Sequence, residues 1–196
     1  MIKYLLKSWK EYLLENKSKG GLLPLDVVDF LITKYAKNPS GPVTLKRGYF
    51  DFNEFGKGFE ETAASYLIPA KMLLVNVSDS DVAQGNARVM VLAIIHEIQH
   101  YNQHMRWDVD DSYREKFSKG NKMPHGRDIF EIDWITMTKF WNNMYSYEAR
   151  PQEKDAIAFA EKHFDEALKM ILDREKELKN KKKGATVKDK KNVRKV

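Results

Sequence analysis

The residues with the clearest chemical potential are His96, Glu97 and His100, which form the segment HEIQH. Apolar residues surround it from Val89 to Ile98, and their spacing predicts a helix. Residues four apart on a helix project from one face, so both imidazoles can meet a single ion. Glu97 lies about 100° round the helix, where its carboxylate can reach a water at the metal without being a ligand. The segment predicts a zinc site with Glu97 as the general base.

A catalytic zinc site needs a third protein ligand, and three residues compete for this position. His104 is disfavoured, because on a continuous helix it lies about 12 Å along the axis from His96. We therefore expect His104 on the helix face, outside the metal site. Of the two remaining residues, Glu148 and Glu153, only Glu153 begins an apolar stripe at helical spacing. A carboxylate facing the core needs a partner, so we favour Glu153 as the ligand, with stabilisation of a helix N-terminus as its alternative role.

Four neighbouring side chains have open roles. Asp155 falls about 200° round the helix from Glu153, so it is a weaker ligand candidate, and otherwise an outer group of the metal site or simply solvated. Tyr101, Tyr145 or Tyr147 could donate a hydrogen bond to the oxyanion that forms during peptide hydrolysis. The sequence gives no basis for choosing among these tyrosines.

A second pattern lies downstream, where a predicted helix reads EKDAIAFA from Glu153 to Ala160. Together with HEIQH it resembles the gluzincin-type zincin metallopeptidases, in particular the ImmA/IrrE family and small zincin-like peptidases common in phage genomes. The resemblance implies a zincin-like fold and hydrolysis of a peptide or protein substrate. It also implies that His96, His100 and Glu153 bind Zn²⁺ and that Glu97 is the general base. By the same resemblance, an edge strand at residues 72–77 would hold the substrate backbone.

The elements that must position these residues follow from hydrophobic periodicity and from Gly and Pro breakers. After the long helix we expect a polar loop through Gly120, Pro124 and Gly126. The predicted fold is α+β and mostly helical, with a small β-sheet beside the HExxH helix. The sequence predicts helices from Leu5 to about Gly20, from Pro24 to about Tyr35, from beyond Asp81 to about Trp107, from Ile129 to Tyr147 and from Pro151 to about Lys179, and strands at 43–47, 62–68 and 72–77.

Composition limits the class of protein. The chain has 196 residues, 42% of them hydrophobic, which suits one domain with a sizeable core. Because it has no cysteine, a disulfide framework and a thiolate zinc site are excluded, and any zinc must be bound by histidine and carboxylate. No apolar segment is long enough to span a membrane, and the N-terminal segment lacks the pattern of a secretion signal. We therefore expect a cytoplasmic protein with no membrane partner.

The net charge of +6 is concentrated at the C-terminal end. Residues 179–196 contain nine Lys or Arg residues and a single acid, Asp189. This composition predicts one folded domain over residues 1–178 and a basic, disordered tail over 179–196. Such a tail can contact nucleic acid without sequence specificity. Two alternative functions remain open. The first is a catalytically silent zincin-like binding or regulatory protein, and the second is a nucleic-acid-associated protein that acts through its tail.

Overall fold

The computed structural model describes residues 24–51, 63–79, 82, 86–119, 121, 123–124 and 128–192. The helix predicted from Leu5 to about Gly20 lies outside these residues. The described part is an α+β fold in which helices outweigh one three-stranded sheet, as the sequence predicted. Its elements are α2 (Pro24–Tyr35), β1 (Lys46–Phe50), β2 (Ala64–Leu67), β3 (Met72–Asn76), α4 (Ala87–Trp107), α5 (Asp111–Ser118), the 3₁₀ turn η2 (Ile129–Glu131), α6 (Trp134–Met144), the 3₁₀ turn η3 (Tyr147–Ala149) and α7 (Pro151–Asn192).

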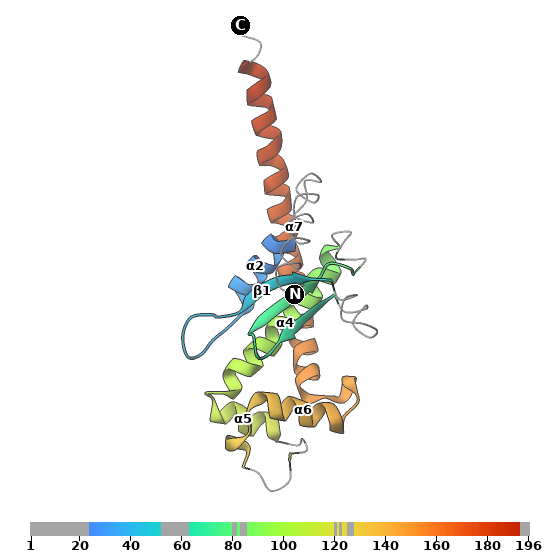
Figure 1. The fold of residues 1–196 in the computed structure, drawn as a ribbon. Helices are drawn as coiled ribbons and strands as arrows, with labels where there is room; N and C mark the ends of the chain where they lie inside the picture. The colour runs from blue at the N-terminus through green and yellow to red at the C-terminus, as the bar shows by residue number, and fades with distance from the viewer. Residues whose placement is uncertain are drawn as a thin grey trace.

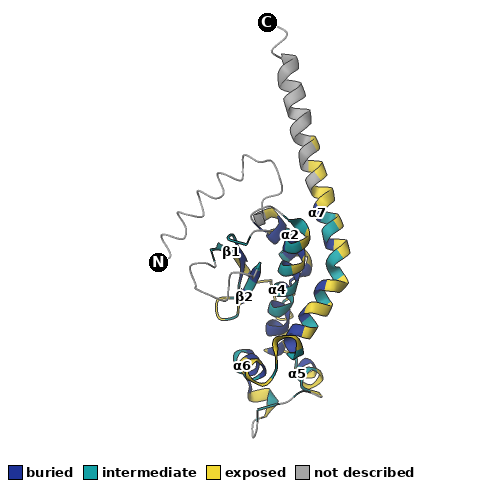
Figure 2. Cartoon of the chain, turned by 90° about the vertical axis from the view of Figure 1, so that its right-hand side faces the viewer, coloured by how far each residue is buried: buried dark blue, intermediate teal, exposed yellow. Residues whose placement is uncertain are grey.

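Helix α4 runs through the middle of the fold (Figure 1) and packs against α2, β2, β3 and α7. It begins after Asn86, whose side chain accepts hydrogen bonds from the amides of Arg88 and Val89. Its end at Trp107 agrees with the predicted end. The buried face of α4 forms much of the main core, together with α2 and the sheet (Figure 2). The α4 residues in this core are Met90, Val91, Ile94, Ile95, Ile98, Tyr101 and Met105.

The sheet has the order β1-β3-β2, with β1 parallel and β2 antiparallel to β3. The prediction that residues 72–77 form an edge strand is therefore wrong, because β3 is paired on both sides. Leu73, Leu74 and Val75 are consecutive buried residues, which is the pattern of a central strand. The strand at the edge beside α4 is β2.

Gly48 lies inside β1, although the strand predicted here ended at residue 47. A Cβ at this position would come within 3.2 Å of the Leu74 side chain, so glycine permits close contact with β3.

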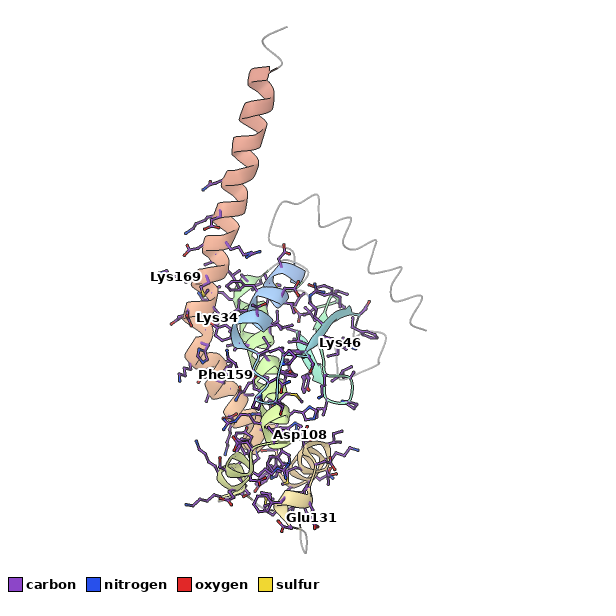
Figure 3. All side chains as sticks on the ribbon, turned by 90° about the vertical axis from the view of Figure 1, so that its left-hand side faces the viewer. Lys34, Lys46, Asp108, Glu131, Phe159 and Lys169 are labelled. Atoms are coloured by element: carbon purple, nitrogen blue, oxygen red, sulfur yellow. The ribbon has the colours of Figure 1, made fainter. Side chains whose placement is uncertain are left out.

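A second, aromatic core lies at the far end of α4, where Asp108 marks the end of that helix near α5 and α6 (Figure 3). Helix α5 was not predicted, because its eight residues carry little apolar periodicity. It begins at the Asp110 cap, which accepts a hydrogen bond from the Tyr113 amide. This core contains Trp107, Tyr113, Ile132, Trp134, Met137 and Trp141.

Two helices differ in length from their predictions. Helix α6 begins only at Trp134, because the Asp133 side chain caps it by accepting a hydrogen bond from the Thr136 amide. Helix α7 continues past Lys179 to Asn192 and projects beyond the body of the fold (Figure 1). None of the described helices combines the length and the apolar character that a membrane crossing requires.

Candidate metal centre

Three potential ligand atoms meet where α4 contacts the first turn of α7. His96 Nε2 lies 3.1 Å from Glu153 Oε2, and His100 Nε2 lies 3.3 Å from the same oxygen. The two Nε2 atoms are 3.1 Å apart. In a tetrahedral zinc site with bonds of about 2.0–2.1 Å, neighbouring ligand atoms are roughly 3.3 Å apart. The three side chains therefore fit a zinc ion with little rearrangement, and within the described residues they are the one group of this kind found.

The local sequence explains this convergence. His96 and His100 are one turn apart on α4, so both rings leave the same face. Glu153 lies in the first turn of α7, and it is only 8% exposed. Below it on α7, Ala156 and Ala160 are buried, and their small side chains allow α7 to pack closely on α4. The predicted apolar stripe thus turns Glu153 toward the histidines.

The competing third ligands lie elsewhere. Glu148 is exposed in η3 and is not part of the group. His104 is buried outside the site, where its Nδ1 lies 2.8 Å from the Tyr66 hydroxyl and its Nε2 lies 3.5 Å from Asp108. Burial lowers the pKa of His104.

Glu97 faces β2, the strand that flanks the site. Its Oε2 accepts a hydrogen bond of 2.7 Å from the Tyr66 amide, and among the described residues none is hydrogen-bonded to its Oε1. Burial raises the pKa of Glu97 above its usual value, although the charges of His100 and His96 oppose this shift. A carboxylate with a raised pKa is a stronger base than an exposed one, and one of its oxygens remains for a water.

A cavity of about 410 Å³ lies next to Glu97, His100 and Glu153. One wall comes from β2 and the residues that follow it, and the opposite wall comes from α6. Three groups of the candidate site, Glu97, His100 and Glu153, have side chains that face this cavity. Its lining residues are Ala64, Ser65, Tyr66, Ile68, Glu97, His100, Trp134, Thr138, Asn142, Tyr147, Gln152 and Glu153.

Of the three tyrosines that the sequence left open, Tyr147 is the one that lines this cavity. Its hydroxyl hydrogen-bonds Glu153, and burial together with the Glu153 charge raises its pKa. Tyr101 is fully buried and its hydroxyl accepts a hydrogen bond from the Thr44 amide. Tyr145 packs on the aromatic core instead.

The charges of the site are strongly coupled when no metal is bound. Burial lowers the pKa of His100, but the hydrogen bond to Glu153 and the charges of Glu97 and Glu153 outweigh burial and raise it to about 9. Burial raises the pKa of Glu153, but the hydrogen bonds from His100 and His96 outweigh burial and hold it well below its usual range. The Glu153 carboxylate is thus ionised and paired with the two histidines.

Two polar side chains close to the site were missed by sequence reasoning, Gln103, which is buried, and Gln99, which is half-buried. Gln99 and Gln103 both donate to Asp155 Oδ2, at 2.7 and 2.8 Å. Asp155 is therefore linked to His100 through Gln103, which favours the role of an outer group over that of a solvated side chain. The signal in the sequence was a second polar pair, four residues apart, on a helix that is otherwise largely apolar.

Comparisons of the chain with protein-family models, with curated proteins and with solved structures give no match.

Proposed function

We propose that this protein is a zinc-dependent metallopeptidase that hydrolyses a peptide or protein substrate with Glu97 as the general base. The observation that carries the proposal is the convergence of His96, His100 and Glu153 beside a cavity that Glu97 also lines. Two imidazoles and one carboxylate are a known ligand set of catalytic zinc sites, which leave a fourth position for water or substrate. A purely structural zinc site would need a fourth protein ligand.

Zinc bound here would lower the pKa of a water and polarise the carbonyl of the scissile bond. The chain's own residues supply the proton transfers. Glu97 takes the proton of the attacking water on its carboxylate and delivers it to the leaving amine. Tyr147, which lines the cavity, would donate a hydrogen bond to the oxyanion after its hydroxyl turns away from Glu153.

The substrate would enter between β2 and α6. In β2 the Tyr66 amide points away from β3 toward Glu97, so the outer edge of this strand faces the catalytic group. An extended peptide can add to such an edge through backbone hydrogen bonds. The role first assigned to residues 72–77 therefore passes to β2 in this proposal.

The proposal includes a zincin-like fold and a cytoplasmic location. Both are expectations from the sequence, the first from HEIQH and the Glu153 helix and the second from the lack of cysteine. Fractionation of the cells that express the protein tests the location directly.

The activity is tested by incubating the zinc-loaded protein with a broad peptide library and identifying new termini by mass spectrometry. We expect cleavage that a chelator abolishes and that added zinc restores. Cleavage that persists in the chelator would contradict the proposal, and so would an absence of cleavage by fully zinc-loaded protein across the library.

A further inference from the structure

A partly buried hydrogen-bond chain connects His100 to α7. His100 Nδ1 is 2.9 Å from Gln103 Oε1. Gln103 is fully buried, and its Nε2 donates to the Gln152 carbonyl at 2.9 Å and to Asp155 Oδ2 at 2.8 Å. All the polar atoms of this buried amide therefore have partners, which is what makes its burial tolerable.

The chain has a fixed direction. A backbone carbonyl can only accept a hydrogen bond, so the Gln103 nitrogen must face Gln152 and Asp155. Its oxygen must then face His100, and His100 Nδ1 must be the donor. When the ring is in its neutral form, the proton on Nδ1 leaves the lone pair of Nε2 free to bind an ion between the three ligand atoms.

The far end of the chain is anchored at the end of α2. Asp155 also accepts from Gln99 Nε2 at 2.7 Å, and Gln99 Oε1 accepts from Asn102 Nδ2 at 3.1 Å. Asn102 Oδ1 in turn accepts from the Lys37 amide at 2.7 Å. Because a backbone amide can only donate, this contact fixes the orientation of Asn102 and then of Gln99. Backbone groups thus set the direction of the chain from both ends.

We propose that Gln103 is a positioning residue for the metal site, which holds His100 with its proton on Nδ1 and its Nε2 toward the ion while Asp155 holds Gln103 in turn. The inference rests on the metal site of the proposed function but does not require peptide hydrolysis. A residue that merely filled the core could be replaced by Met, which has a similar volume and adapts to irregular gaps. A positioning residue could not, because Met has no oxygen to accept the Nδ1 proton.

The first test compares Gln103→Met with Gln99→Met. Both changes remove a donor to Asp155 from neighbouring turns of α4, but only Gln103 touches a metal-binding histidine. Zinc affinity, measured by competition with a chelating dye, should fall about 10- to 100-fold in Gln103→Met and less than about threefold in Gln99→Met. The visible absorption of the cobalt-substituted protein should change only in Gln103→Met. Wild-type affinity and an unchanged cobalt spectrum in a folded Gln103→Met protein would overturn the proposal.

The second test needs no variant and so does not depend on whether Gln103→Met folds. Long-range ¹H–¹⁵N NMR of the wild type should show a slowly exchanging proton on His100 Nδ1, in both the metal-free and the zinc-loaded protein. A bare Nδ1 in either form would overturn the proposal. Peptidase activity does not enter this readout, so an inactive protein with a protonated Nδ1 would refute the proposed function and leave the role of Gln103 standing.

Discussion

Replacing Glu97 with Gln separates the chemistry of the proposed site from its assembly. The carboxamide has the size of the carboxylate, and its oxygen can still accept the hydrogen bond that the Tyr66 amide now gives at 2.7 Å. The wall of the cavity should therefore be kept. Because burial raises the pKa of Glu97, the charged carboxylate costs stability in its present surroundings, and the neutral amide should not lower the melting temperature.

The amide cannot take a proton from water. General acid–base catalysis contributes about 100- to 10,000-fold, so kcat/KM should fall by that factor. This loss corresponds to an increase of about 3 to 5 kcal/mol in the activation free energy. Glu148→Gln is the matched control, since it makes the same change at an exposed glutamate outside the metal-binding group. That variant should keep wild-type activity.

The assay is cleavage of one peptide, taken from the library screen, by both variants and the wild type at equal zinc content. Equal rates for wild type and Glu97→Gln would remove Glu97 from the role of general base. If neither protein cleaves any peptide at full zinc occupancy, the catalytically silent zincin-like protein is the better description.

Three other outcomes are expected. Deleting residues 179–196 should leave zinc content and melting temperature nearly unchanged and should abolish salt-sensitive retention on nucleic acid, because the segment has nine basic residues and few apolar ones; a much lower melting temperature would show that it packs on the body. His104→Ala should cost about 1–3 kcal/mol of stability in chemical denaturation, through loss of its buried contact with Tyr66, and should keep all of the zinc; zinc loss would refute this. In the presence of chelator, the free energy of unfolding of the wild type should exceed that of Glu153→Gln by most between pH 4.5 and 6.5. The stability that comes from the raised pKa of His100 is fully present below pH 6.5 and is lost toward about pH 9, and the stability that comes from the lowered pKa of Glu153 is present above pH 4.5. A difference that does not change with pH would contradict the pairing of Glu153 with His100.

The parts of the site that lie on helices followed from spacing. Two histidines one turn apart share a face of α4 whatever the rest of the fold does, and the apolar stripe of α7 fixes which way Glu153 points. The sequence also favoured Glu153 over Glu148, and the structure brings Glu153 to the histidines while it leaves Glu148 exposed.

The parts that depend on pairing between distant segments did not follow. Which strand lies at the edge is decided by how the sheet assembles, and the apolar character of residues 72–77 indicated a strand without giving its place. Gln103 looked like any polar residue on a helix, because its partners, Asp155 and the Gln152 carbonyl, come from about fifty residues downstream. Helix α5 depends on its Asp110 cap and on aromatic contacts rather than on periodicity of its own.

The central claim is that His96, His100 and Glu153 bind one zinc ion. The most direct test is the metal content, by elemental analysis, of the purified wild type, Glu153→Ala and Glu148→Ala, each dialysed against the same trace of zinc. The account predicts about one zinc per chain in the wild type and in Glu148→Ala, with strong loss in Glu153→Ala. A wild type without zinc, or zinc kept in Glu153→Ala and lost in Glu148→Ala, would contradict it.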